Sequence, residues 1–141
     1  MLQSTLNRAI AEHELWVDTM GEKGRRLQLW GADLSGLSVS GACLLGAEFR
    51  NCQARNVTFL YTILTDSVWD GSDLSYSTLY RVTARDTLAR FTICSGLKLD
   101  SESIWTGADF RGAVLEPWNR TVLFERGATF GALSKLFRKV F

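Results

Sequence analysis

The chain has 141 residues, of which 46% are apolar and 22% charged, and its formal net charge is +1 at pH 7. This length and composition predict one globular domain with its own core, and the balanced charge gives no indication of nucleic-acid binding. The three cysteines lack metal-ligand spacing, the N-terminus is polar, and no apolar run is long enough for a membrane span. We therefore expect a cytoplasmic protein without disulfides or zinc.

The first predicted element is a helix over residues 4–19. Ser4 has the residue type of an N-cap, and apolar side chains recur at helical spacing along one face. These side chains are Leu6, Ala9, Ile10, His13, Trp16, Val17 and Met20. The stretch "GEKG" then ends the helix. We expect residues 1–26 to form an N-terminal cap that covers the open end of the element that follows.

A five-residue repeat extends from residue 27 to residue 116. Stepping by five from Leu29 gives 18 apolar centres, provided that one extra residue is allowed near residues 100–102. None of these centres, nor any residue two before a centre, is charged, whereas random placement in these 36 positions would give about eight charges. Residues two apart share one face of an extended segment, but a spacing of five reverses that face. The chain must therefore turn after every short segment, always in one direction, and wind into a coil.

Five segments of this region, "GADLSG", "GACLLG", "GAEFRN", "GSDLSY" and "GADFRG", resemble the pentapeptide repeat family, whose unit reads roughly A(D/N)LxG. The resemblance covers residues 27–116. It implies an all-β solenoid, a right-handed quadrilateral β-helix with four repeats per coil. Eighteen repeats would form about four and a half coils. The local register of residues 82–94 stays open, because Ala84, Ala89 and Cys94 are small for centre positions.

Residues 117–141 are predicted to form a C-terminal cap. Pro117 has no N–H and is expected to end strand pairing, and Trp118 is expected to plug the last coil. The tail has apolar residues at the spacing of an amphipathic helix, with basic residues on the other face. These apolar residues are Leu133, Leu136, Phe137, Val140 and Phe141. In one interpretation this helix packs on an end of the solenoid, either its own or that of a second copy, and the resemblance implies a homodimer formed through that end. In the alternative, the protein is a structural adaptor that docks on a membrane through this helix.

No catalytic or metal-binding pattern is present in the sequence. His13 is the only histidine, so no second histidine is available for a Ser or Cys triad. Asp66, Asp70 and Asp73 lie close together without the spacing of a calcium loop. "GEKG" lacks the GK(S/T) ending of a phosphate-binding loop. We predict a protein that is not an enzyme and that uses no cofactor and no metal.

The coil also predicts which residues share a face, because positions 20 apart stack on one another. We name one side of the coil the third face; its centres are Val39, Phe59, Leu79 and Leu99. Tyrosine and arginine, which are enriched at protein interfaces, gather on and beside it. The predicted partner-binding residues are Leu60, Tyr61, Tyr80, Arg81 and Arg85. The alternative is that these large side chains only shield the strand ladder.

We expect a small, rigid, non-catalytic binding module, bacterial or phage-encoded, that inhibits or protects one protein target. The best-known members of the family inhibit or protect DNA gyrase, so the resemblance implies a topoisomerase target; a defence-system or toxin protein is the other candidate. Those members are thought to imitate DNA with an acidic rod. Residues 29–116 hold ten acidic and seven basic side chains, a net charge of −3, which imitates duplex DNA poorly. No direct nucleic-acid binding is expected.

Overall fold

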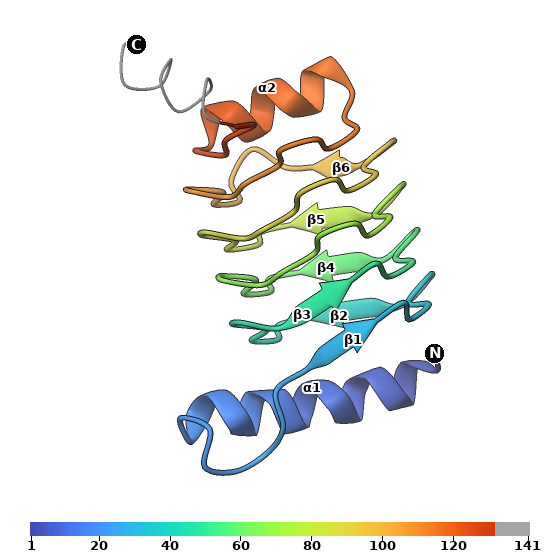
Figure 1. Ribbon diagram of the computed structural model, residues 1–141, viewed down its shortest axis with the longest axis vertical. Helices are drawn as coiled ribbons and strands as arrows, with labels where there is room; N and C mark the ends of the chain where they lie inside the picture. The colour runs from blue at the N-terminus through green and yellow to red at the C-terminus, as the bar shows by residue number, and fades with distance from the viewer. Residues whose placement is uncertain (132–141) are drawn as a thin grey trace.

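The computed structural model describes residues 1–131 and shows a column of stacked coils with a helix at each end (Figure 1). Helix α1 (Gln3–Asp18) lies across the N-terminal end of the column, and helix α2 (Pro117–Glu125) lies across the C-terminal end. All strand pairing between them is parallel, because each coil repeats the direction of the coil before it.

Among residues 1–131, six short strands mark two sides of the coil. On the first face, β1 (Gln28–Trp30) pairs with β3 (Glu48–Arg50). The third face carries a four-stranded parallel sheet in the order β2, β4, β5, β6. Its strands are Ser38–Ser40, Thr58–Leu60, Thr78–Tyr80 and Lys98–Leu99. Paired residues are 20 apart, as in the pair of Phe59 with Leu79, so one coil takes four five-residue repeats.

The spacing between paired residues is 21 instead of 20 wherever the pair spans residues 100–102. Ile63 bridges to Thr83, whereas Thr83 bridges to Ile104. The single extra residue therefore lies where the break in the five-residue pattern placed it, at 100–102. Residues 82–94 keep the regular register, since Ala84 and Cys94 are both fully buried at centre positions.

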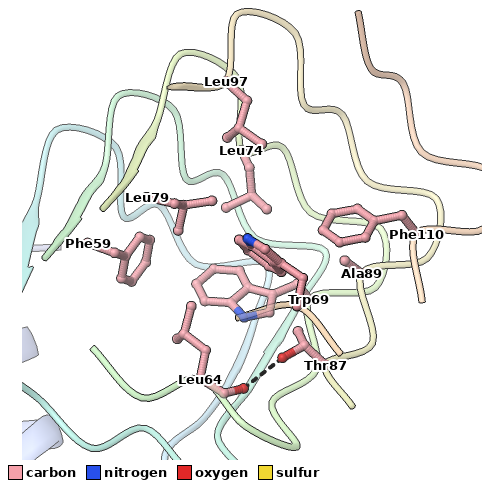
Figure 2. Close-up of a pocket in the computed structure, with 10 residues that line it drawn as sticks. Phe59, Leu64, Trp69, Leu74, Leu79, Thr87, Ala89, Leu97 and Phe110 are labelled. Carbon is pink, nitrogen blue, oxygen red and sulfur yellow. Dashed lines mark hydrogen bonds between the residues drawn. The ribbon is translucent and has the colours of Figure 1, made fainter. Parts of the chain in front are cut away.

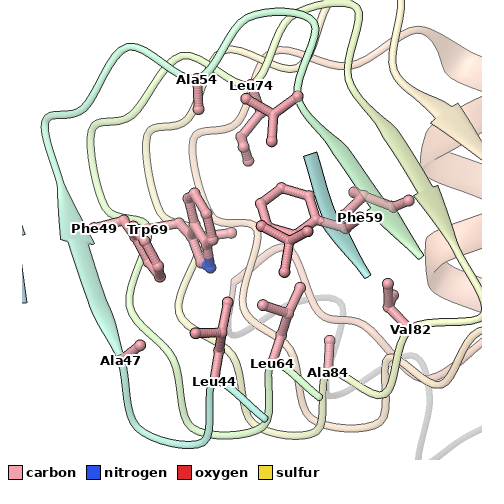
Figure 3. Packing of buried hydrophobic residues seen from close by; sticks show 14 of the residues in the cluster. Leu44, Ala47, Phe49, Ala54, Phe59, Leu64, Trp69, Leu74, Val82 and Ala84 are labelled. Carbon is pink, nitrogen blue, oxygen red and sulfur yellow. The ribbon is translucent and has the colours of Figure 1, made fainter. Parts of the chain in front are cut away.

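Aromatic rings from successive coils stack inside the column. Figure 3 shows Phe49 beside Trp69; their centroids are 4.1 Å apart, and Phe59 meets Trp69 edge-on at 5.4 Å. Ala89 occupies a centre between Trp69 and Phe110 on the first face, so its small side chain leaves room for the neighbouring rings. Packing there is nearly complete: an internal cavity of about 20 Å³ remains beside Trp69 and Ala89 (Figure 2).

Buried serine hydroxyls connect one coil with the next. Ser72 Oγ accepts the N–H of Cys52 at 2.9 Å and donates to the carbonyl oxygen of Phe49 at 2.7 Å. Ser77 does the same one repeat later, where its Oγ accepts the N–H of Val57 at 3.0 Å. These hydroxyls satisfy main-chain groups at the corners that no strand partner reaches.

Helix α1 begins one residue earlier than predicted and has no side-chain cap. Its N-cap is Leu2, so the expectation of Ser4 as N-cap is wrong. The side chain of Gln3 explains the difference, because its bonds to Ser38 hold the first turn in place. Leu6, Ile10 and His13 are buried against the coil, whereas Met20 is 94% exposed beyond the helix end and does not join the apolar face.

Polar side chains of α1 complete the unpaired edge of the first coil. The Gln3 amide accepts the Ser38 N–H at 2.9 Å and donates to the Ser38 carbonyl oxygen at 2.8 Å, as a neighbouring strand would. Glu14 Oε2 accepts the N–H of Cys43 at 3.1 Å. The helix thus covers the core and also occupies part of an edge that would otherwise invite pairing with another chain.

The C-terminal end differs from the prediction at Pro117 and Trp118. Pro117 begins α2 instead of ending the ladder, which resumes after the helix where Asp109 bridges to Thr129. A proline at the first helical position loses no hydrogen bond, which is the physical reason. Trp118 is 67% exposed, so the last coil is covered by the buried side chain of Leu123 instead.

The predicted docking helix lies outside the described residues. This applies to Leu133, Leu136, Phe137, Val140 and Phe141. The homodimer and the membrane adaptor that depend on this segment stay predictions.

Candidate protein-interaction site

Four of the five predicted partner-binding residues lie together on the third face. Leu60 pairs with Tyr80 across β4 and β5, and the ring of Tyr61 meets the ring of Tyr80 edge-on at 5.9 Å. The guanidinium of Arg81 lies 5.6 Å from the centroid of the Tyr80 ring. We call Leu60, Tyr61, Tyr80 and Arg81 the third-face cluster. Tyr61 is 61% exposed, so an aromatic and cationic surface faces the solvent.

Arg85, the fifth predicted residue, does not join this cluster. It follows the corner and lies on the next face of the coil, where its side chain is exposed. Within residues 1–131 it forms no ion pair, unlike Arg81, which pairs with Glu102. The geometry therefore places Arg85 at the margin of the site.

The backbone at the corner holds two bulky residues in an unfavourable conformation. Tyr61 and Arg81 have φ angles of 52° and 53°, in the left-handed region that glycine and asparagine tolerate best. Tyr76 has a φ angle of 62°, but its ring covers Gly96 of the next coil, where a side chain would collide with it. No glycine lies one coil after Tyr61 or Arg81, so packing of this kind does not account for their side chains.

Asp100 and Glu102 also belong to the site and were missed by the sequence analysis. At most corners the N–H group bonds to a main-chain carbonyl oxygen, as the Tyr61 N–H does to that of Tyr80 at 3.0 Å; the Gly96 N–H, which bonds to the Glu116 carboxylate, is another exception. At Arg81 the acceptor is the Asp100 side chain, whose Oδ2 lies 2.9 Å from the N–H. The extra residue at 100–102 lets the Asp100 carboxylate take the place of the main-chain acceptor, and it brings Glu102 to the Arg81 guanidinium. The interrupted repeat was the signal that could have indicated both residues.

Hydrogen bonds fix the charge of this corner. Burial alone would raise the pKa of Asp100, but hydrogen bonds from Ser103 and from the Arg81 N–H outweigh it and lower the pKa. The pKa of Arg81 is raised, mainly by its hydrogen bond with Tyr80. The site therefore presents one cation and two anions beside exposed aromatic rings, which suits a protein surface better than a nucleic acid.

Half of the acidic side chains of the solenoid form ion pairs. Of the ten acidic side chains in residues 29–116, five pair with arginine. These five are Glu48, Asp70, Asp73, Glu102 and Asp109.

In residues 1–131 no group of three or more His, Cys, Asp or Glu is placed to hold a metal ion, and no helix is long and apolar enough to cross a membrane.

The coil geometry and the sequence agree with a known family. A family model described as pentapeptide repeats matches residues 31–68 with eight copies. The 20-residue coil described above continues the same pattern to residue 99. Residues 31–68 therefore carry pentapeptide repeats, and the rest of the coil resembles them in geometry. Among curated proteins, none matches the sequence.

A solved structure of a pentapeptide repeat protein shares the fold, a right-handed β-helix. HetL of Nostoc sp. strain PCC 7120, a protein involved in heterocyst differentiation regulation, is 18% identical with a TM-score of 0.50 over 71% of this chain. This chain covers 45% of HetL, less than half of its length. Rfr23 of Cyanothece 51142 is 18% identical over 60% of this chain and 68% of Rfr23, with a TM-score of 0.28. QnrB1, a plasmid-mediated fluoroquinolone resistance protein, is 16% identical over 76% of this chain and 75% of QnrB1, with a TM-score of 0.33.

Proposed function

We propose that this pentapeptide repeat protein is a non-catalytic binding module that engages a protein partner through the third-face cluster. Residues 27–116 form the binding body in this proposal, and residues 1–26 and 117–141 form its caps. The observation that carries it is the pair of exposed, left-handed residues Tyr61 and Arg81, whose side chains the packing of the coil does not require. Strain that folding does not explain is a reason to expect function.

The chemistry of the cluster favours a protein over other partners. Tyrosine and arginine provide most of the binding energy at many protein interfaces, because their side chains combine a large contact area with directed hydrogen bonds. The four-stranded sheet beneath them keeps these side chains in fixed positions, which lowers the entropy that binding costs. Arg81, Asp100 and Glu102 would supply directional polar contacts around the rings.

Imitation of DNA is a weaker basis for the function. Half of the acidic side chains in residues 29–116 are already paired with arginine, so the solenoid does not present a dense row of free negative charges. The roles of HetL and QnrB1, heterocyst regulation and fluoroquinolone resistance, differ from each other, so the shared fold does not determine the target. We propose inhibition or protection of a gyrase-type topoisomerase, or of a defence or toxin protein, as the activities to test first.

The proposal is tested by affinity capture from bacterial lysate with three forms of the protein. These are the wild type, a Tyr80→Ala, Arg81→Ala variant, and a Phe91→Ala, Arg111→Ala variant. The third form is a matched control, because Phe91 is 65% exposed and lies half a coil away from Arg81, at the diagonally opposite corner. Bound proteins are quantified by mass spectrometry.

We expect one protein to be retained by the wild type and by the control, and to fall at least tenfold with the Tyr80 and Arg81 variant. Purified partner and protein should then bind with little dependence on salt, since most of the contact area is apolar. Equal recovery with all three forms would show that the third-face cluster is not the site. Loss with the control alone would move the site to the opposite corner.

A further inference from the structure

A groove lies at the N-terminal end of the solenoid, between α1 and β1. Its volume is about 680 Å³, within the range of ligand sites. Thr5, Arg8, Ala9 and Glu12 line it from the helix, and Leu27, Gln28 and Leu29 line it from the start of the coil. Figure 1 shows β1 as the outermost strand at this end, with α1 running beneath it. The groove is lined by residues 5–29, whereas the third-face cluster belongs to later coils and lies on a different face.

One side of the β1 backbone has no partner among residues 1–131. Pairing with β3 uses the Leu27 carbonyl oxygen, 2.9 Å from Glu48 N–H, and the Gly31 N–H, 3.0 Å from Arg50 O. Main-chain groups of a strand alternate between its two sides. The N–H and C=O groups of Gln28 and Trp30 therefore point away from β3, toward the N-terminal end. On the third face, the equivalent groups of Ser38 are bonded by Gln3, so α1 leaves β1 open while it closes part of the edge elsewhere.

Positive charge surrounds this open edge. Arg8 and Arg25 are exposed and form no ion pair with any described residue. Arg26 pairs with Glu48 at 3.1 Å and donates to the Gly46 carbonyl oxygen at 2.8 Å, so it is already occupied. The groove is lined by three arginines and one acid, Glu12, which leaves a net charge of +2.

An apolar floor lies between the cations and the strand edge. Leu27 is buried, whereas Leu29 is only partly buried, although its stacked equivalent one coil later, Phe49, is 2% exposed. The difference follows from the position of Leu29 at the rim, where no coil precedes it. A bound chain would therefore find backbone donors and acceptors, an apolar surface and two free guanidinium groups in one place.

We propose that this groove binds a short, extended, acidic peptide segment of a partner protein, which adds a strand to the free edge of β1. Main-chain bonds to Gln28 and Trp30 would hold the segment in register. Side chains on one side of the added strand would cover Leu29, and carboxylates on the other would pair with Arg8 and Arg25. The proposal does not depend on the third-face cluster.

The first test measures binding of a synthetic probe by fluorescence anisotropy. The probe is a fluorescein-labelled peptide of eight residues in which valine and glutamate alternate. We expect saturable binding by the wild type that weakens about tenfold in Arg25→Glu and changes less than twofold in Arg85→Glu. Both arginines are exposed and unpaired among the described residues, so the second variant controls for net charge. A probe with lysine in place of glutamate should not bind.

The second test reads the strand edge itself. In ¹⁵N-labelled protein, the amide signals of Gln28 and Trp30 should shift on addition of the probe, whereas that of Ser40 should not. Ser40 is the matched position, because its N–H also faces the open end but lies beside a different groove, lined by Gln3, Asn7 and Glu14. A probe that is N-methylated at alternate residues should lose binding.

Three outcomes would overturn the proposal. The first is absence of probe binding up to about 1 mM, and the second is binding that Arg25→Glu or N-methylation leaves unchanged. The third is a shift of the Gln28 and Trp30 signals with protein concentration alone, which would show that a second copy of the chain occupies the edge. Loss of lysate capture in the third-face variant has no bearing on these outcomes, so the two proposals fail separately.

Discussion

The imidazole of His13 accepts a hydrogen bond from the main-chain N–H of Leu27 at 2.9 Å, and its other nitrogen lies 2.9 Å from the carbonyl oxygen of Leu45. Because an N–H group points at Nδ1, the proton must be on Nε2, which donates to Leu45. The ring is fully buried, and this burial lowers the pKa of His13 below its ordinary value of 6.5. The helix α1 is thus fastened to both ends of the first coil by one neutral side chain.

This arrangement predicts that stability falls in mild acid. Since the folded pKa lies below the unfolded value, the unfolded chain takes up a proton first as the pH falls below about 6.5. The free energy of unfolding should be nearly constant from pH 8 to pH 7 and then decrease by at most about 1.4 kcal/mol per pH unit. Urea unfolding at pH 7.5, 6.5 and 5.5 measures the slope. His13→Leu should remove most of the slope in this window, and an equally steep loss in that variant would refute the assignment.

A second prediction concerns the amide of Gln3, which bonds both main-chain groups of Ser38. Gln3→Ala removes both bonds at the partly exposed rim, and we expect a loss of about 1 kcal/mol. Gln3→Glu keeps an acceptor for the Ser38 N–H but places a carboxylate against the Ser38 carbonyl oxygen, so it should not restore stability. Hydrogen exchange of the Ser38 amide should accelerate in the alanine variant and remain slower in the glutamate variant. Equal exchange in all three proteins would show that the bonds contribute nothing.

The repeat could be predicted from the sequence because its cause is local. Every five-residue segment must place a centre such as Leu44 or Leu64 inward, and both are buried as expected. The stacking of Leu60 on Tyr80 followed from the coil length alone and is confirmed by their pairing. Even the extra residue could be located, since it shifts the frame of all later centres, including Trp105.

Features that depend on distant partners could not be predicted in this way. His13 was recognised as part of an apolar face, but its role depends on groups 14 and 32 residues away. The interrupted repeat marks the segment that holds Asp100, but the five-residue pattern does not show that its carboxylate replaces a main-chain carbonyl as the acceptor of the Arg81 N–H. Pro117 is equally compatible with the end of a ladder and the start of a helix, and the short segment after it gave too little periodicity to choose.

A third prediction concerns the buried serine hydroxyls. In Ser72→Ala, the N–H of Cys52 and one acceptor position on Phe49 lose their partner in a buried environment, which should cost about 1–3 kcal/mol. Ser77→Ala should lose a similar amount for the same reason. Ser40→Ala is the control, since this serine is exposed, and its stability should stay within about 0.5 kcal/mol of the wild type. Chemical unfolding of the three variants tests the comparison, which fails if Ser72→Ala matches Ser40→Ala.

The last prediction separates function from folding at the left-handed corners. Tyr61→Gly relieves a backbone strain of about 1 kcal/mol and loses only an exposed ring contact, so its stability should equal or slightly exceed that of the wild type. In Tyr76→Gly the same relief is offset, because its ring covers Gly96 and carries the Arg55 guanidinium at 5.3 Å. We therefore expect Tyr76→Gly to be the less stable variant, by about 1 kcal/mol. If the third face binds a partner, Tyr61→Gly should nevertheless bind it at least tenfold more weakly. A Tyr61→Gly protein that is destabilised by several kcal/mol would show instead that the ring serves the fold, and the case for the third-face cluster would lose its main support.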